Sequence, residues 1–494
     1  MKRFTASVVM VLIFSGSLYG QSRSIPEHPR ELRFDSLEFD PPIADDHRHT
    51  LDSGDLAFIV EDHALPLVNV SVFVRTGSYL DPVEQRGLAS LTGAQMRAGG
   101  TLELSAADFD EEVAFLAAQI SSSIGGTSGQ ASVNCLTKDL DVALSLFFDM
   151  LARPRFEESR LDLAKSQMIQ SMERRNDSTR SIESREWNRL MRGDEHFSTL
   201  LTTRGSIESI ERDDLIGFHQ RYFYPGNFVF AIAGDVDTDQ IVEMLNKELS
   251  GWRTSKSSVA DVPKPSSEIR RGLFGVDKAE VNQGRVSIGH LGTTRDNPDR
   301  YPLIIMNDIL GGGGFSSRLM TRIRSDEGLA YSVGSRYGMG TYYDGIFRVA
   351  FQSRSQTVAR AASIVLEEIE KIRSELVSEE ELSNSVASFV ETFTRNFSSA
   401  VSTANLFATD AYTGRDPEYL MNYRAKISAV TPEDVLRVAK RYLRPEDLAI
   451  LIVGDLDTIT EGDPDYPQYS LDGIAGTSLS QIPLPDPFTM IYPE

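Results

Sequence analysis

The most specific chemistry in the sequence belongs to an arginine and a tyrosine, Arg324 and Tyr331. Arg324 ends an expected helix over Ser317–Arg324, and Tyr331 begins an expected strand, with Gly328 as the helix stop between them. This arrangement would let a guanidinium and a phenol project into one cleft. Both groups can donate hydrogen bonds to a peptide carbonyl and to the oxyanion formed when that carbonyl is attacked. Spacing alone favours a plainer arrangement, in which Arg324 pairs with Glu327 and Tyr331 packs in the core.

A glycine run precedes this helix and consists of Gly311, Gly312, Gly313 and Gly314. It resembles a phosphate-binding loop, but the Gly-Lys-Ser/Thr ending that places a lysine on the phosphates is missing. The run is therefore weak evidence for a nucleotide. Glycines also permit unusual backbone angles and close approach, as in a hinge or a loop past which a peptide runs.

Residues that could hold a metal are sparse. No two of the seven histidines have the three- or four-residue spacing that places two imidazoles on one helix face, and only His47 and His49 stand close together. A solvated N-terminal loop or edge is the favoured interpretation of that pair, with a weak metal site on one face of a strand as the alternative, because no third ligand is implied. His196 and His219 are expected at the surface, and the lone Cys135 as a buried, inert thiol. The sequence predicts no metal site on this chain.

Composition excludes several functions. The 494 residues include 50 Lys and Arg against 72 Asp and Glu, a net charge of −22, which argues against a nucleic-acid partner or a basic membrane-binding face. Hydrophobic residues make up 40%, so wholesale disorder is excluded. A single cysteine excludes an internal disulfide framework and a cysteine-based zinc cluster.

The first residues are typical of a cleavable signal peptide, predicted over residues 1–20. Lys2 and Arg3 precede the apolar run Val8–Phe14, and small residues follow. The run is too short to cross a bilayer, and no later segment is long enough, so no membrane span is expected after cleavage. We expect an exported protein, periplasmic or extracellular.

The elements that must position Arg324 and Tyr331 belong to an internal repeat. Each copy has an expected helix ending in Arg-Tyr, a proline, an apolar strand and a terminal Gly-Asp. The first copy contains Arg221-Tyr222, Pro225 and Gly234-Asp235, and the second contains Arg441-Tyr442, Pro445 and Gly454-Asp455. The offset is 220 residues at each position. This constant register predicts two homologous halves.

The patterning within each half mixes strands and helices. Expected strands are Val68–Val74 and Val286–Ile288, and expected helices are Gly87–Met96, Asp139–Leu151 and Val358–Leu376, the last followed by a capping box at Ser378 and Glu381. The predicted fold class is α+β, with two homologous domains, each a largely antiparallel sheet with helices packed on one face. The predicted domains span 33–253 and 281–458, with a linker over 254–280 and an extended tail over 459–494.

The segment from Gly312 to Tyr331 resembles the C-terminal-half signature of the insulinase (pitrilysin) metallopeptidases. It reads Gly-Gly-Gly-Phe-Ser-Ser-Arg and then Arg-Ser-Asp-Glu-Gly-Leu-Ala-Tyr. The members most similar in size are the mitochondrial processing peptidase and bacterial two-subunit enzymes, and the resemblance extends from Val68 to Thr458. It implies that the two domains form half of a clam shell. It also implies that Arg324 and Tyr331 hold the substrate backbone near the scissile bond.

The sequence departs from the family at the zinc motif. Catalytic members carry His-x-x-Glu-His after Gly-Leu-Ala, whereas here Ser90 and Ala94 stand at the histidine positions and Gly93 at the glutamate position. Near the third ligand, Gln170 and Ser171 stand where glutamate is expected, and Glu173 is out of register. A catalytic zinc site needs three protein ligands and a base. Alone, this chain is expected neither to bind zinc nor to cut peptides.

The resemblance implies a non-catalytic subunit of an exported zinc endopeptidase, paired as a heterodimer with a homologue that carries His-x-x-Glu-His and the zinc. In the complex, Arg324 would bind a carbonyl of an extended peptide substrate, Tyr331 would stabilise the oxyanion, and Gly311–Gly314 would line the chamber. The alternative is a peptide-binding or scaffold protein of the same fold with no proteolytic role, which sequesters extended peptides by strand addition. An independent hydrolase is disfavoured because the ligands are missing.

Overall fold

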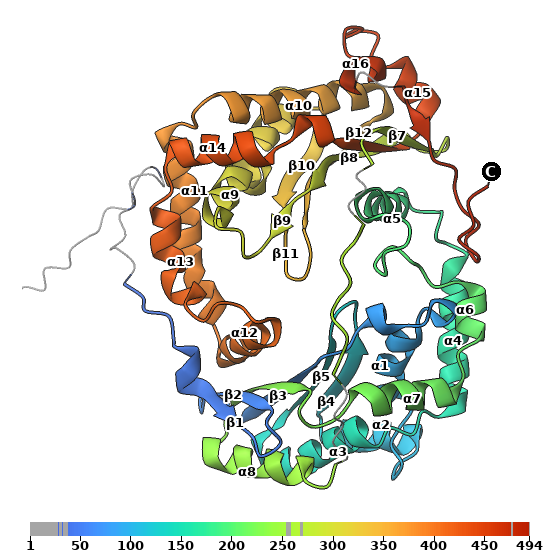
Figure 1. The fold of residues 1–494 in the computed structure, drawn as a ribbon, viewed down its shortest axis with the longest axis vertical. Coiled ribbons are helices and arrows are strands. Elements are labelled where there is room, and N and C mark those ends of the chain that lie inside the picture. Colours follow the sequence, from blue (N-terminus) through green and yellow to red (C-terminus); the bar gives the residue numbers. More distant parts are fainter. Residues whose placement is uncertain are drawn as a thin grey trace, which may run out of the picture. The chain divides into compact units, whose positions relative to one another are not determined.

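The computed structural model describes residues 28, 32, 38–252, 258–266, 270–475 and 478–493. All of its named helices and strands lie in one compact unit, Asp40–Glu494 (Figure 1). Within the described ranges, no helix has both the length and the apolar character needed to span a membrane. The predicted signal peptide, residues 1–20, lies outside the described residues, so export stays a prediction.

The unit contains two six-stranded sheets. The first has the order β1-β2-β6-β3-β5-β4, in which β2 and β6 are parallel and the other neighbours are antiparallel. Its strands are β1 (Arg48–Thr50), β2 (Leu56–Glu61), β3 (Leu67–Val74), β4 (Gln119–Ile124), β5 (Gly129–Leu136) and β6 (Phe228–Gly234).

The second sheet has the order β10-β12-β8-β13-β7-β14, antiparallel from β10 to β13 and parallel from β13 to β14. Its strands are β7 (Gly272–Asp277), β8 (Gln283–Leu291), β10 (Ala330–Tyr337), β12 (Ile346–Arg354), β13 (Ala449–Gly454) and β14 (Ser480–Gln481). A small separate pair joins β9 (Thr293–Thr294) and β11 (Met339–Gly340).

The internal repeat matches the two sheets. The helices α7 (Arg212–Tyr222) and α14 (Pro432–Tyr442) have the same length and lie 220 residues apart, and each begins with a capping box. The strands after them, β6 and β13, are each parallel to one neighbour and antiparallel to the other. The predicted fold class, α+β with two homologous and largely antiparallel sheets, is confirmed.

The other expected elements also form. They are β3, β8, α1 (Leu88–Ala98), α3 (Leu140–Ala152), α10 (Val358–Ser374) and α11 (Glu379–Thr392), with the capping box between Ser378 and Glu381. In the range expected as linker, residues 258–266 have no helix or strand, whereas Gly272–Asp277 form β7. The range expected as an extended tail contains α16 (Leu471–Ala475) and β14, which pairs with β7.

The remaining helices are α2 (Ala106–Phe115), α4 (Glu158–Met172), α5 (Thr179–Arg192), α6 (Arg204–Glu208), α8 (Thr238–Leu249), α9 (Arg300–Asn307), α12 (Ala400–Thr413), α13 (Tyr419–Ser428) and α15 (Leu456–Glu461).

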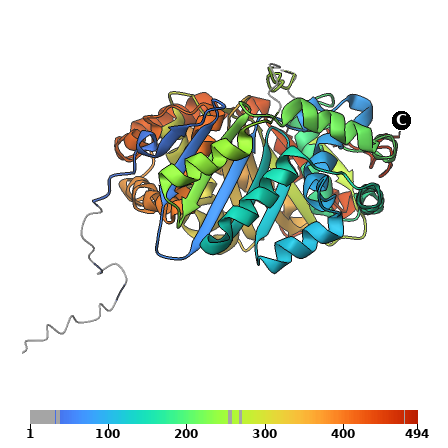
Figure 2. The same cartoon turned by 90° about the horizontal axis from the view of Figure 1, so that it is seen from below.

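One face of each sheet packs on helices of its own half. The valines of β3 alternate inward to a core that α3 and α8 complete, and these helices, teal and yellow-green, cross the sheet in Figure 2. In the second half, Ile450 and Ile452 of β13 pack with α10 and α14. Burial of these apolar side chains is the main stabilising contribution in each half.

The other face of each sheet is covered by a helix from the opposite half. Helix α12 lies on the first sheet, where the Tyr412 hydroxyl donates to the backbone oxygens of Val74 and Thr127. Helix α5 lies on the second sheet, where Trp187 and Leu190 pack against Leu451 and its neighbours on β13. Both placements are visible in Figure 1. This reciprocal packing explains why β6 and β13 are buried on both faces.

The carboxylate of Glu183 anchors α5 to the second sheet. It accepts hydrogen bonds from Arg285 Nε at 3.1 Å and Ser287 Oγ at 2.6 Å, and it forms an ion pair with Arg348 Nη2 at 2.8 Å. The residue is 4% exposed. A buried carboxylate needs such partners, because transfer of an unpaired charge out of water is strongly unfavourable.

Two histidines expected at the surface are buried, so that expectation is wrong. His196 is 6% and His219 is 5% exposed. His219 lies on the same face of α7 as Leu215 and Tyr222, and its Nε2 hydrogen-bonds the Leu151 oxygen at 2.7 Å. Burial lowers the pKa of His219 to about 4.

The buried histidine makes folding sensitive to acid. The pKa of His219 in the folded protein lies below that of an exposed histidine. Its contribution to the free energy of unfolding is therefore complete above pH ~6.5 and is lost as pH falls toward about 4. We expect His219→Gln to flatten the pH dependence of the unfolding free energy over this window by about 1–3 kcal/mol. Urea unfolding between pH 7 and 4 measures this, with His49→Gln as control. Parallel curves for wild type and His219→Gln would contradict it.

The anchoring role of Glu183 predicts a large loss on truncation. Glu183→Ala leaves Arg285 and Arg348 without their shared carboxylate and should lower the unfolding free energy by about 3–5 kcal/mol. The matched control is Glu173→Ala, at an exposed glutamate just after α4, with an expected change within about 0.5 kcal/mol. Equal losses in the two variants would show that Glu183 does not anchor α5.

Candidate functional site

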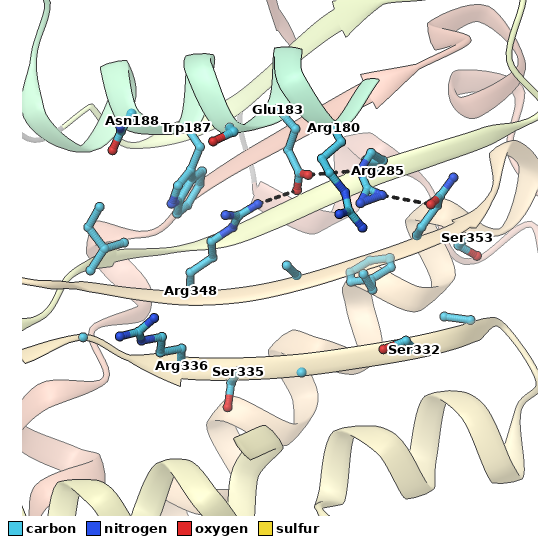
Figure 3. Close-up of a pocket in the computed structure, with 18 of the residues that line it drawn as sticks. Arg180, Glu183, Trp187, Asn188, Arg285, Ser332, Ser335, Arg336, Arg348 and Ser353 are labelled. Atoms are coloured by element: carbon cyan, nitrogen blue, oxygen red, sulfur yellow. Dashed lines mark hydrogen bonds and ion pairs between the residues drawn. The ribbon is translucent and has the colours of Figure 1, made fainter. Parts of the chain in front are cut away.

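A cavity of about 1180 Å³ lies between α5 and the strands β8, β10 and β12 (Figure 3). It exists because α5 is held off the sheet by long polar side chains on these strands, among them Arg285 and Arg348, which reach up to Glu183. The strand β10, at the edge of its sheet, lines one side of the cavity and contributes Tyr331.

The structure brings Arg324 and Tyr331 together. The guanidinium carbon of Arg324 lies 4.7 Å from the centre of the Tyr331 ring. Tyr331 is 83% exposed rather than packed in the core. Glu327 is paired with Arg322 and Arg360 instead of Arg324. The plainer arrangement that spacing favoured is therefore not the one formed.

Local backbone irregularities place the two side chains. Between Ala330 and Val333 the pairing of β10 with β12 shifts register, as in a β-bulge, and both intervening residues, Tyr331 and Ser332, are exposed. Arg324 lies on a π-helical segment, Met320–Asp326, that ends before Gly328, whose φ is +63°. Bulges and π-turns re-aim side chains and occur often at functional sites.

A third side chain, Phe315, completes this group. Its ring centre also lies 4.7 Å from the Arg324 guanidinium carbon, and the ring is 73% exposed. Two aromatic contacts hold the guanidinium by cation–π attraction while its N–H groups stay available as donors. Phe315 follows the glycine run directly, but no motif in the sequence predicts its contact with Arg324.

The helix that carries Arg324 is fixed by an ion pair at its start. Arg318 donates to both carboxylate oxygens of Glu381, at 2.6 and 3.0 Å. Burial would raise the pKa of Glu381, but the Arg318 hydrogen bond and the backbone N–H of Ser378 lower it to about 2. The same glutamate completes the capping box of α11, so one side chain ties two helices together.

The glycines Gly311–Gly314 lie behind β10. A Cβ on Gly311 would stand 2.7 Å from the backbone nitrogen of Ser335, so glycine is needed for this close packing. Tyr331 belongs to the lining of the cavity, whereas these four glycines and Arg324 do not. A role in lining a chamber shared with a partner stays a prediction.

The zinc-motif positions lie on α1. Ser90 and Ala94 are exposed and one helical turn apart, whereas Gly93 is buried against β4. A Cβ on Gly93 would stand 2.3 Å from the Ile124 backbone nitrogen, and the Gly93 oxygen accepts a hydrogen bond from Ser122 at 2.6 Å. The position that corresponds to the general base therefore carries no carboxylate, and the packing leaves no room for a side chain there.

The third-ligand region lies on and just after α4. Gln170, Ser171 and Glu173 are exposed. Over the described ranges, no group of three His, Cys, Asp or Glu side chains could hold a metal ion. His47 and His49 do not share a strand face, because His47 ends a 3₁₀ turn and hydrogen-bonds the Ile59 oxygen. Hydroxyl, methyl and glycine positions on α1 do not fit a zinc ion.

The lone Cys135 is 2% exposed, as expected. Burial raises the pKa of its thiol to about 11, which keeps it protonated and unreactive at neutral pH.

Comparison with known proteins identifies relatives of both halves. Residues 57–203 match the family model described as insulinase (peptidase family M16), and residues 209–389 match the one described as peptidase M16 inactive domain. Together the two matches cover more than half of the chain. A protein of Helicobacter pylori named non-peptidase homolog YmxG is 28% identical over 316 residues, covering 63% of this chain and 72% of that protein.

Two further relatives extend the comparison. A probable mitochondrial-processing peptidase subunit beta of Arabidopsis thaliana is 22% identical over 492 residues, covering 90% of this chain and 86% of that protein. The crystal structure of a peptidase M16 inactive domain from Pseudomonas fluorescens has a TM-score of 0.74 and 22% identity, covering 82% of this chain and 97% of that chain. At this identity the structural likeness shows the fold alone.

The tight packing of Gly93 predicts an unusual response to alanine. Gly93→Ala should destabilise the protein by about 1–3 kcal/mol, because its methyl group collides with the backbone of β4. The control is Gly217→Ala inside α7, where a Cβ would meet nothing within 4 Å and alanine should stabilise by about 0.5–1 kcal/mol. Chemical denaturation measures both. A stabilising Gly93→Ala would show that α1 does not close onto β4.

Proposed function

This chain belongs to the insulinase family, peptidase family M16, as an inactive homologue that lacks the zinc motif, and we propose that it is the non-catalytic subunit of an exported zinc endopeptidase. Its partner would be a homologous chain that carries His-x-x-Glu-His and the zinc. The observation that supports this role is the contact between Arg324 and Tyr331 in the second half, combined with a zinc-motif helix in the first half that is closed by packing at Gly93.

In the proposed complex, this chain positions an extended peptide. Arg324, stacked against Phe315 and Tyr331, donates from the edge of its guanidinium to a substrate carbonyl near the scissile bond. The Tyr331 hydroxyl, free of any core packing, donates to the oxyanion that develops on the attacked carbonyl. These donors act on substrate held in the partner's site, which supplies the zinc, the base and the attacking water.

A peptide-binding protein without proteolytic role is the second candidate. It is favoured by one observation, that a large cavity lies within this chain beside the edge strand β10 and needs no partner to form. An edge strand offers unpaired backbone groups to an added strand.

The subunit role predicts a loss of turnover when either donor is removed. Co-expressed with a homologue that has His-x-x-Glu-His, Arg324→Ala and Tyr331→Phe should each lower kcat for peptide cleavage by roughly ten- to a thousandfold, with the complex intact by gel filtration. Matched controls are Arg395→Ala and Tyr466→Phe, which lie outside this group and the cavity. Unchanged turnover in the first two variants would exclude the shared site. Cleavage by this chain alone that a chelator inhibits would exclude the non-catalytic role.

A further inference from the structure

The cavity has the opposite charge to the chain as a whole. Its charged lining consists of six arginines and one glutamate, in a protein with a net charge of −22. They are Arg180, Arg192, Arg285, Arg336, Arg348, Arg354 and Glu183. Arginines gathered on one concave surface attract an anionic ligand and orient it through planar donors.

Internal ion pairs account for only part of this charge. Glu183 is shared by Arg285 and Arg348, which are 17% and 31% exposed, and these contacts are drawn in Figure 3. Arg192 donates to Ser198 Oγ, and its Nε is buried without a hydrogen-bond partner in the described part of the chain. One carboxylate therefore serves an excess of guanidinium groups.

Three arginines of the cavity are exposed and unpaired. Among the described residues, the side chains of Arg180, Arg336 and Arg354 have no ion pair or hydrogen bond. Arg336 on β10 stands directly opposite Arg348 on β12 in the strand register. Like charges at opposed positions destabilise a sheet, and because Glu183 pairs with Arg348, Arg336 is the member of this pair left without an anionic partner among the described residues.

The unpaired arginines are spread along the cavity instead of meeting at one point. Arg354 lies at the end of β12 that pairs with the start of β10, and Arg336 lies toward the other end of β10. From Tyr331 to Arg336, a strand spans roughly 17 Å at about 3.3 Å per residue. Charges at this separation suit several carboxylates on an extended chain better than a single small anion.

We propose that this cavity binds acidic segments of extended peptides, whose Asp and Glu carboxylates pair with Arg180, Arg336 and Arg354. The inference rests on the proposed function, because it assigns the substrate class of the chain that holds the peptide. The peptide runs along β10, so its backbone reaches Tyr331 at the cavity end while its side chains meet the arginines. A long polyanion is disfavoured because it would extend beyond the cavity over a strongly acidic protein.

Direct binding measurements on the full chain test the charge preference. Fluorescence anisotropy compares a short labelled Gly/Ser peptide that has Glu at every second position with the same peptide carrying Gln. We expect the Glu peptide to bind about tenfold or more tightly at low salt, with the preference shrinking as salt is added. Equal affinity of the two peptides would overturn the proposal. A short oligothymidylate that binds more tightly than the Glu peptide would overturn it too.

Variants locate the effect in the cavity. The triple variant R180Q/R336Q/R354Q should bind both peptides equally, whereas R174Q/R271Q/R395Q, with the same charge change at exposed sites outside the cavity, should keep the preference. The single variant Arg336→Glu should weaken binding of the Glu peptide and strengthen binding of the same peptide with Lys in place of Glu. It provides the test if the triple variant does not fold. If the control triple variant loses the preference for the Glu peptide to the same extent, the preference comes from general charge attraction and the assignment to the cavity is refuted.

The two proposals fail in different ways. If Arg324→Ala lowers turnover in the complex while Glu and Gln peptides bind alike, the acidic-substrate inference is wrong and the subunit role stands. If the free chain prefers the Glu peptide but Arg324→Ala and Tyr331→Phe leave turnover unchanged, the subunit role is wrong and the cavity assignment stands.

Discussion

The structure depends on the exchange of two helices between its halves. A single six-stranded sheet with helices on one face would leave its other face, including the apolar side chains of β6 or β13, in water. Helix α12 covers that face of the first sheet, and α5 covers that of the second. Neither half can therefore bury its sheet alone, which ties both halves into one unit.

The packing of α5, which is anchored by the buried carboxylate of Glu183, also creates the cavity. Because α5 contacts the second sheet by apolar packing at β13 and by ion pairs at β8 and β12, a cavity remains over β10 and β12. The helix that stabilises the fold is thus a wall of the site. The two homologous halves differ at their functional positions. In the first half, α1 closes onto β4 at Gly93. In the second, the bulge in β10 leaves Tyr331 open beside Arg324.

Sequence reasoning recovered what local patterns encode. The constant offset of the repeat predicted the two sheets, alternating valines predicted β3, and the Arg324–Tyr331 segment predicted a helix and a strand that meet. It missed features set by contacts between distant segments: the stacking of Phe315, the exchange of α5, and the cavity whose arginines come from four separate elements. The burial of His219 was also missed, although it shares a helical face with Leu215 and Tyr222.

The contrast between an acidic protein and an arginine-lined cavity has a physical reason. Charges on the outer surface are screened over about 8–10 Å in physiological salt, so beyond that distance they add little to the potential in the cavity. Inside, low-dielectric walls strengthen the field of the nearby guanidinium groups. Glu183 neutralises enough of this charge for α5 to dock, while Arg336 remains uncompensated opposite Arg348. Folding thus tolerates an arginine without a counter-charge beside one that Glu183 already neutralises, and an acidic chain bound in the cavity would supply the missing carboxylate.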